Sequence, residues 1–414
     1  MNPARPARTR PPTTPVRAAK RPGRACFRTY DAPPRMHHAS AAATFDTPFS
    51  VPFRHRVTFT RGVLEPSNPS LAEALAGSGR CVAFVDEGVS RAHPELGARL
   101  GAYLRAHPGM PSLACVESVG GGERCKRSME VPERVVRAVD AHRIDRQSCV
   151  IAVGGGAVLD AVGFGAAIAH RGCRLVRLPT TVLSQDDAGM AVKNGINAGG
   201  KKNFVGAFAV PHAVVCDEAF LGSSPEWSWL GGFSEAVKIA LLRDPPLLDR
   251  IERDAAAIRA RDLAAAMPVI VRSAELHYRH IVLGGDPFEQ RSARPLDYGH
   301  WLAHRLEGLT DGELPHGQAV SIGVAVDTMY SVHAGLLDPS AGARVLGVLR
   351  ALGLPTSHPL LADLSAVESG LEEFREHLGG RLTVTLLRGI GESIDVHAVD
   401  AGTLRRAVDA AAAT

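Results

Sequence analysis

The sequence predicts an α/β chain in which a doubly wound parallel sheet is followed by an all-helical domain. Three observations support this fold class. Short apolar runs alternate with helical stretches as far as Pro225, the pattern of parallel strands joined by crossover helices. Beyond Pro225 the apolar residues recur at helical spacing over long stretches. Three glycines, Gly154 to Gly156, join one apolar run to the next helical stretch.

The composition is that of a globular chain without a membrane span. Of 414 residues, 45% are hydrophobic and 22% are charged, and the net charge is only +4. No apolar run is long enough to cross a bilayer. The seven cysteines include no C-x-x-C pair, and several lie in apolar, strand-like runs. We therefore expect reduced, mostly buried thiols in a cytoplasmic protein, and neither a disulfide framework nor a zinc cluster.

Residues 1–47 form a basic, Pro- and Arg-rich extension that we expect to be disordered. From Met1 to about Ser40 there is one acid, Asp31, among many Arg, Lys and Pro residues, and such a composition cannot build a core. The extension lacks the apolar segment of a secretory signal. A dispensable extension is favoured over a transit peptide or a nucleic-acid-binding tail.

Residues 48–225 are expected to form the sheet domain. The stretch 51–64 has the alternation of a strand pair or hairpin. The apolar runs that follow have the character of buried parallel strands. They occupy residues 81–89, 112–118, 173–181 and 213–221, helical stretches occupy 95–107 and 131–144, and 148–172 reads as strand, glycine turn and helix.

Residues 226–414 are expected to form an all-helical domain that binds metal and substrate. Helix-periodic stretches occupy residues 231–242, 246–283, 317–337 and 340–354, a strand-like piece lies at 381–387, and 400–413 closes with a helix. A site at the junction would draw on both domains, and such junctions commonly hold a substrate cleft.

The glycine run is a candidate nucleotide site. Because Gly155 and Gly156 lack side chains, the backbone can approach a pyrophosphate at the start of the next helix. The run is not the G-x-G-x-x-G fingerprint, so a plain tight turn is at least as good an interpretation. Further candidates are Asp160 one turn into the helix, Glu123 for ribose hydroxyls, Lys126 for a phosphate or ribose, and Thr180 and Thr181.

The segment 184–208 carries polar side chains among glycines and small residues. Gly-rich loops with Lys and Asn suit the binding of an oxyanion or phosphate, and a solvated loop is the alternative. The apolar segments on both sides favour the functional interpretation. The candidates are Asp187, Lys193, Asn197, Lys202 and Asn203.

A second cluster of candidates has the spacing of a metal site. His300 and His304 are four residues apart and share one helix face, as do Glu235 and Lys238, which are three apart. His316 follows after a turn-like segment. A glutamate and two or three histidines from different helices supply what a catalytic Zn²⁺ needs, three N/O ligands and an open position. For any one histidine a capping or core role is the better interpretation, but the set favours a metal.

From about Val57 to the C-terminus, these motifs resemble those of the sugar phosphate cyclases, the family of 3-dehydroquinate synthase. GGGAVLDAVGFGAA is similar to the family's GGGxxxDxxGFxAA, KKNFVGAF to GKNMIGAF, FSEAVKIALL to LAEVIKYGI, YGHWLAHRLE to LGHTFGHAIE, and LPHGQAV to LxHGEAV. The motifs occur in family order and at nearly family spacing. The resemblance implies a Rossmann-like N-terminal domain, NAD⁺, a Zn²⁺ or Co²⁺ ion and a homodimer.

The resemblance also implies roles for single residues. The metal ligands would be Glu235, His300 and His316. NAD⁺ would be held by Asp86, Glu123, Lys126, Gly155, Gly156, Asp160, Thr180 and Thr181. The substrate site would contain Asp187, Lys193, Lys202, Asn203, Lys238 and His304, of which Asp187, Lys193, Lys238 and His304 are the catalytic candidates. Arg171 matches an arginine that the family uses to reach the phosphate in a neighbouring subunit.

The chain departs from 3-dehydroquinate synthase where that enzyme grips the substrate carboxylate. The family's lysine is His277 here, its arginine is Ala293, and an asparagine before the first metal histidine is Asp297. The loss of a bidentate arginine and the gain of an acid disfavour a carboxylate substrate. RPLDYGHW instead resembles RPIDFGHTW of cyclases that act on sedoheptulose 7-phosphate, although those usually lack a histidine at position 304. The run from Gly284 also resembles cyclases of ebo gene clusters.

The activity implied is that of a carbon–oxygen lyase acting on a ketose phosphate. NAD⁺ would oxidise the substrate transiently, phosphate would leave, and reduction and an intramolecular aldol step would give a valiolone-type cyclitol. The alternatives are 3-dehydroquinate synthase, a metal-dependent polyol dehydrogenase and an inactive scaffold. The polar segment that contains Lys193, Lys202 and Asn203 counts against the dehydrogenase. The presence of all three predicted metal ligands counts against the scaffold.

Overall fold

The computed structural model describes residues 45–199, 201–288, 295–378 and 380–413. Nearly all of the expected extension 1–47, and also Ala293, therefore lie outside the described residues. The chain divides into Met1–Pro52 and Phe53–Thr414, and residues 45–56 hold no helix or strand. Helix α7 begins at Glu226, but the domain boundaries at residues 48 and 226 stay predictions.

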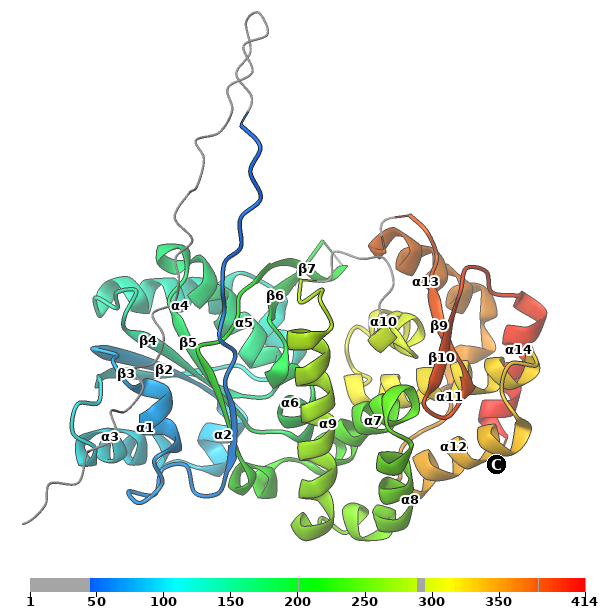
Figure 1. Ribbon diagram of the computed structural model, residues 1–414, viewed down its shortest axis with the longest axis horizontal. Coiled ribbons are helices and arrows are strands. Elements are labelled where there is room, and N and C mark those ends of the chain that lie inside the picture. Colours follow the sequence, from blue (N-terminus) through cyan, green and yellow to red (C-terminus); the bar gives the residue numbers. More distant parts are fainter. Residues whose placement is uncertain (1–44, 200, 289–294, 379, 414) are drawn as a thin grey trace, which may run out of the picture. The chain divides into compact units, whose positions relative to one another are not determined.

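A six-stranded parallel sheet forms the centre of the N-terminal half (Figure 1), which confirms the predicted fold class. The strand order is β1-β8-β5-β4-β2-β3, and each neighbouring pair is parallel. The strands are β1 (Val57–Thr60), β2 (Arg80–Asp86), β3 (Ser112–Val119), β4 (Cys149–Gly154), β5 (Arg174–Pro179) and β8 (Ala213–Asp217).

The strand order changes direction at β2. The chain passes from β2 outward to β3, and then returns to place β4 on the other side of β2. In open α/β sheets, ligands bind at such a switch point, outside the carboxyl ends of the strands. Here those ends are Asp86 and Gly154.

Helices cover both faces of the sheet (Figure 1). Alternate residues of β2 enter different cores: Cys81, Ala83 and Val85 pack with α1 and α3, whereas Val82 and Phe84 pack with α4 and α5. Burial on both faces explains why these strands read as continuous apolar runs. The helices are α1 (Ser70–Leu75), α2 (Glu87–Ala92), α3 (Leu96–Ala106), α4 (Glu130–Ala141), α5 (Gly156–Ile168) and α6 (Val182–Asp186).

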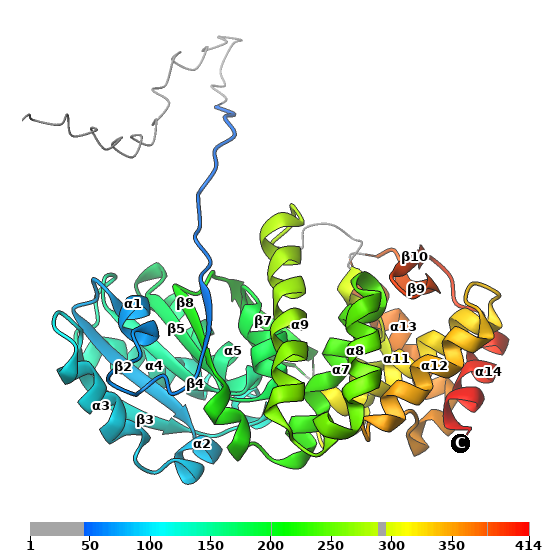
Figure 2. The ribbon, with the colours of Figure 1, turned by 60° about the horizontal axis from the view of Figure 1, so that its bottom comes forward.

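In the described residues of the C-terminal half, helices predominate, and one antiparallel hairpin is formed by β9 (Val384–Gly389) and β10 (Glu392–Val396). Helices α7 and α11 are buried along most of their lengths and share one core with the helices around them (Figure 2). No helix in the described ranges combines the length and apolar character that crossing a membrane requires. The helices are α7 (Glu226–Arg243), α8 (Pro245–Arg259), α9 (Leu263–Leu283), α10 (His300–Leu309), α11 (His316–His333), α12 (Pro339–Ala351), α13 (Leu364–His377) and α14 (Ala401–Ala412).

Two local expectations were wrong, and one stretch that was correctly predicted as helical is divided. The stretch 51–64 is not a hairpin, because its single strand β1 pairs in parallel with β8, far along the chain. The segment 184–208 is not one loop, because residues 193–208 form an antiparallel hairpin of β6 (Lys193–Ala198) and β7 (Lys201–Phe208). The stretch 246–283 is two helices, because Arg261 adopts a positive φ of 66° and Asp262 caps the start of α9.

Candidate active site

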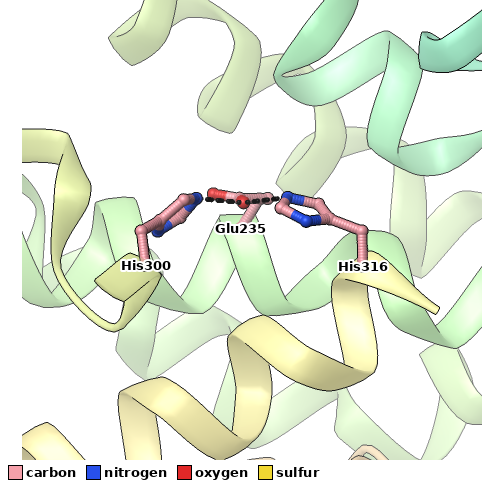
Figure 3. A group of neighbouring side chains, drawn as sticks. All are labelled: Glu235, His300 and His316. Carbon is pink, nitrogen blue, oxygen red and sulfur yellow. Dashed lines mark ion pairs between the residues drawn. The ribbon is translucent and has the colours of Figure 1, made fainter. Parts of the chain in front are cut away.

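Three side chains from three helices meet at one point of the helical half (Figure 3). His300 and His316 approach Glu235 from opposite sides. The Nε2 atom of His300 lies 3.2 Å from Oε1 of Glu235, and the Nε2 atom of His316 lies 3.5 Å from the same oxygen. One ligand atom of each residue lies within 4.8 Å of those of the other two. The structure therefore brings the predicted metal ligands together.

Local packing fixes each of these residues. Glu235 is fully buried within α7. His300 is the first residue of α10, and it follows Gly299, whose φ of 76° suits a glycine. A Cβ atom at Gly299 would lie 2.7 Å from the backbone nitrogen of Val324, so the start of α10 packs directly against α11. His316 is the first residue of α11.

The outer nitrogen of each imidazole has a hydrogen-bond partner. Nδ1 of His300 lies 3.1 Å from the carbonyl oxygen of Tyr298, and Nδ1 of His316 lies 3.2 Å from both carboxylate oxygens of Glu307. An Nδ1–H group that donates outward leaves the lone pair of Nε2 facing inward. This is how metal-binding histidines are usually oriented.

The donor set fits a divalent ion. From the residues that the structure describes, neither carboxylate oxygen of Glu235 accepts a hydrogen bond of normal geometry, although both oxygens are buried. Burial tends to raise the pKa of Glu235, but Lys238 and His300 hold it well below the usual value, so the group is a carboxylate. One carboxylate and two imidazoles leave a coordination position open for substrate or water, as in catalytic zinc sites.

Lys238 and two further acids, Asp187 and Asp297, lie beside the ligand group. Lys238 is buried and its Nζ atom lies 2.6 Å from Oε2 of Glu235. Burial tends to lower the pKa of Lys238, but Glu235, Asp187 and Asp297 raise it, so the group is a cation. Asp187 follows α6 and Asp297 ends the 3₁₀ turn Pro295–Asp297. Asp187 and Asp297, both predicted at the substrate site, thus both stabilise the charge of Lys238.

His277 pairs with Asp187. Its Nε2 atom lies 3.0 Å from Oδ1 of Asp187, and its Nδ1 atom lies 3.1 Å from the carbonyl oxygen of Ser273. His277 belongs to α9 and is buried. By the resemblance described above, His277 stands where the family has a lysine. Its imidazole already contacts Asp187, an acid of the same site.

His304 lies one turn after His300 on α10, as the spacing predicted. Its ring centroid is 5.5 Å from that of His300 and 6.2 Å from that of His316. Burial, and then the charge of Lys202, hold the pKa of His304 well below its usual value. The ring is therefore a neutral imidazole at neutral pH.

The nucleotide candidates gather at the switch point of the sheet. A Cβ atom at Gly154 would lie 3.2 Å from Cβ of Asp86, and one at Gly155 would lie 3.4 Å from Cγ2 of Thr181. Gly155 is the N-cap of α5 and has no side chain to cover the free NH groups of that helix. The backbone nitrogen of Thr180 donates to the carbonyl oxygen of Gly154. Whether these residues bind NAD⁺ stays a prediction.

A chain of ion pairs runs from this end of the sheet toward the metal ligands. The Nζ atom of buried Lys126 lies 2.7 Å from Oδ2 of Asp160 and 2.5 Å from Oδ1 of Asn203. Next to Asn203 on β7, Lys202 lies 3.7 Å from Oε1 of Glu123 and 2.5 Å from Oε1 of Glu307. Hairpin β6–β7 therefore connects the nucleotide candidates with α10.

Three predicted residues are exposed: Asn203, described above, and also Lys193 and Arg171. Lys193, the first residue of β6, is exposed. Arg171 is exposed in the short turn Ala169–Arg171 after α5, with φ of 62°.

Sequence reasoning missed three residues that support the site. Glu307 contacts His316 as described above. Asp327 accepts from the backbone nitrogen of Gly299 at 2.8 Å and from Nε1 of Trp301 at 2.9 Å, so it holds the start of α10. Arg177, fully buried on β5, donates to carbonyl oxygens of the segment before β6. The spacing in the sequence could have indicated Glu307, because it lies seven residues after His300 and three after His304 in one predicted helix.

Comparisons with known proteins identify the family. The 3-dehydroquinate synthase N-terminal family model matches residues 116–230, and its C-terminal counterpart matches residues 232–374. The chain is 35% identical to 2-epi-5-epi-valiolone synthase of Streptomyces glaucescens, covering 87% of this chain and 92% of the relative. It is also 35% identical to 3-dehydroquinate synthase of Halorhodospira halophila, covering 66% and 76%.

A solved structure supports the same family. The 2-epi-5-epi-valiolone synthase of Streptomyces hygroscopicus subsp. jinggangensis 5008, with NAD⁺ and Zn²⁺ bound, is 29% identical, with a TM-score of 0.81 over 89% of this chain and 99% of that one. A 2-deoxy-scyllo-inosose synthase, 21% identical with a TM-score of 0.70, covers 85% and 95% and shows the same fold. The chain therefore belongs to the 3-dehydroquinate synthase family of sugar phosphate cyclases.

Proposed function

We propose that this protein is an NAD⁺- and metal-dependent cyclase that converts a ketose phosphate, sedoheptulose 7-phosphate, into a valiolone-type cyclitol. Its 35% identity to a 2-epi-5-epi-valiolone synthase along 92% of that enzyme supports the reaction. The NAD⁺ and Zn²⁺ bound to a 29% identical relative support the cofactors. Co²⁺ is an equivalent ion for the same donor set.

The pairing of His277 with Asp187 is the observation that supports this substrate over a carboxylate-bearing one. A lysine at position 277 could form an ion pair with a substrate carboxylate. The imidazole of His277 instead contacts Asp187 at 3.0 Å. Asp297, close to Lys238, adds a further negative charge to the site. Acids repel a carboxylate and accept hydrogen bonds from hydroxyl groups, so the site suits a polyhydroxylated ketose.

We assign metal binding to residues of the helical half and NAD⁺ binding to residues of the sheet half. Glu235, His300 and His316 would hold the metal, and Asp86, Gly155, Gly156, Thr180 and Thr181 would hold NAD⁺. When bound, NAD⁺ supplies hydride transfer and the metal polarises the reacting oxygen. Lys193, Lys202, Asn203 and a partner's equivalent of Arg171 would orient the phosphate. His304 and Lys238 are the proton carriers, and Asp187 holds His277 in place.

Phosphate release from a panel of heptulose phosphates tests this function. With NAD⁺ and Zn²⁺ or Co²⁺, the purified protein should release phosphate from sedoheptulose 7-phosphate. The matched control is the carboxylate-bearing heptulosonate phosphate, which should be a much poorer substrate. Release from the heptulosonate alone would show that the protein is a 3-dehydroquinate synthase and that the inference from His277 is wrong.

We also propose a homodimer. Exposed apolar side chains occur at the end of α5, close in sequence to Arg171, and on hairpin β6–β7, which packs against α5. Ile168 is 41% exposed, Phe204 is 64% exposed and Phe208 is 47% exposed. Exposed apolar side chains of this kind suit a protein interface, and a second copy is the partner that the resemblance of Arg171 to a family arginine favours. The cytoplasm remains the proposed location, because the described cysteines are free thiols.

The substitution Phe204→Asp should dissociate this dimer. A charge in the centre of an apolar interface loses its hydration without gaining a partner. Light scattering after gel filtration should report half the wild-type mass. Trp227→Asp, at an exposed aromatic residue in the first turn of α7, is the control and should leave the mass unchanged. A monomeric wild-type protein at micromolar concentration would refute the proposal.

A further inference from the structure

We propose that Glu307 is a positioning residue that fixes His316 for metal binding and ties it to Lys202 of the β6–β7 hairpin. The inference deepens the proposed function, because it concerns the metal site on which that function depends. It requires no assumption about the substrate.

The first step is the geometry of His316. Its ring lies between two carboxylates: Nδ1 is 3.2 Å from both oxygens of Glu307, and Nε2 is 3.5 Å from Oε1 of Glu235. The contact with Glu307 fixes the Nδ1–H tautomer once a metal takes the Nε2 position. A carboxylate that accepts from the outer nitrogen also makes the inner nitrogen a stronger donor to a cation.

The second step is the placement of Glu307 itself. It is 5% exposed and lies in the last turn of α10, where the helix dipole disfavours a negative charge. A buried acid at that position needs compensation. Lys202 supplies it at 2.5 Å from a strand of the other half of the molecule. Helix propensity and core packing do not explain a glutamate at this position, whereas the contact with His316 does.

The third step concerns Lys202. Its ammonium group lies between Glu307 and Glu123, at 2.5 Å and 3.7 Å. Lys202 therefore pairs with Glu307 and links the metal side to the predicted ribose contact. A lysine held in this way would serve as a bridge between the two halves, in addition to any contact with the substrate phosphate.

Metal affinity tests the proposal without any substrate. Co²⁺ is titrated into metal-free protein against a competing chelator, and its visible absorption is recorded. Glu307→Gln keeps the size of the side chain but removes its charge, and it should weaken Co²⁺ binding by roughly 10–100-fold. Glu313→Gln, at an exposed acid just after the same helix, is the matched control and should bind like the wild type.

Lys202→Met separates the two contacts of Glu307. It leaves the pair of Glu307 and His316 intact and removes a nearby positive charge, so it should keep or strengthen Co²⁺ binding. An equal loss of affinity in Lys202→Met and Glu307→Gln would assign the effect to the hairpin contact and overturn the role at His316. Wild-type affinity in Glu307→Gln would also overturn it.

Two further measurements distinguish a loss of metal affinity from misfolding and from a failure of the proposed reaction. Thermal unfolding of the metal-free variants shows whether Glu307→Gln is folded. If it is not, Glu307→Asp, which retains the charge on a shorter side chain, should show the weakened binding, and wild-type affinity there would refute the proposal. Phosphate release by the wild type is scored separately, so failure of the proposed reaction and failure of this inference are distinguishable.

Discussion

Glu235→Gln should abolish metal binding and reduce phosphate release by about 10³-fold or more. The variant removes the one anionic ligand, and a metal that polarises the reacting oxygen contributes several kcal/mol to the transition state, with each ~1.4 kcal/mol worth tenfold in rate. Metal content of the purified variant by elemental analysis, and phosphate release, check the result. A wild-type metal content would contradict the assignment of Glu235 as a ligand.

The stability of this variant has to be separated from its loss of metal. Glu235 and Lys238 form a buried ion pair at 2.6 Å, and the removal of one partner from such a pair costs about 3–5 kcal/mol. The double variant Glu235→Gln, Lys238→Met removes the uncompensated ammonium as well. We expect it to recover much of the lost thermal stability and still to bind no metal, which would assign the loss to the missing ligand.

Arg177→Met should destabilise the sheet half and displace the segment that leads into β6. The fully buried guanidinium group donates to the carbonyl oxygens of Gly189, Ala191 and Lys193 and to the side chain of Asn194. Burial lowers the pKa of Arg177 to about 10, so the group stays charged at neutral pH. Each acceptor left unpaired costs about 1–3 kcal/mol, and we expect a total loss of about 4 kcal/mol.

Arg174→Met is the matched control, because Arg174 lies on the same strand but is only partly buried. Its loss should change the stability by about 1 kcal/mol or less. Urea unfolding followed by fluorescence compares the two variants. Equal midpoints for Arg177→Met and Arg174→Met would show that the buried network does not hold this segment.

The sheet half was largely predictable because its central strands β2, β4, β5 and β8 are buried on both faces. The runs at β2 and β4 are continuously apolar, and a candidate residue lies at the carboxyl end of β2, Asp86, and directly after that of β4, Gly155. Hairpin β6–β7 was not predictable from its own residues. Its strands contain Lys, Asn and Gly, which are poor strand formers, and Asn194 packs against Gly163 of α5, a contact that no local pattern reveals.

The metal ligands were predictable from helical spacing, but their support was not. His300 and His304 share a helix face by period alone. Glu307 acquires its role only when the hairpin brings Lys202 to it, and Asp327 only when α10 packs against α11. Arg177 sits in a run that reads as a buried strand, and its acceptors lie in a segment that was predicted to be a loop. Contacts between distant segments decide all three cases.

The ratio of NADH formed to phosphate released tests the central claim most directly. The nicotinamide absorbance and the phosphate concentration are followed together while the protein, with NAD⁺ and Zn²⁺, acts on sedoheptulose 7-phosphate. A cyclase that returns its hydride in every cycle should release phosphate with no accumulation of NADH. One NADH for each substrate consumed, without phosphate, would identify a polyol dehydrogenase and contradict this account.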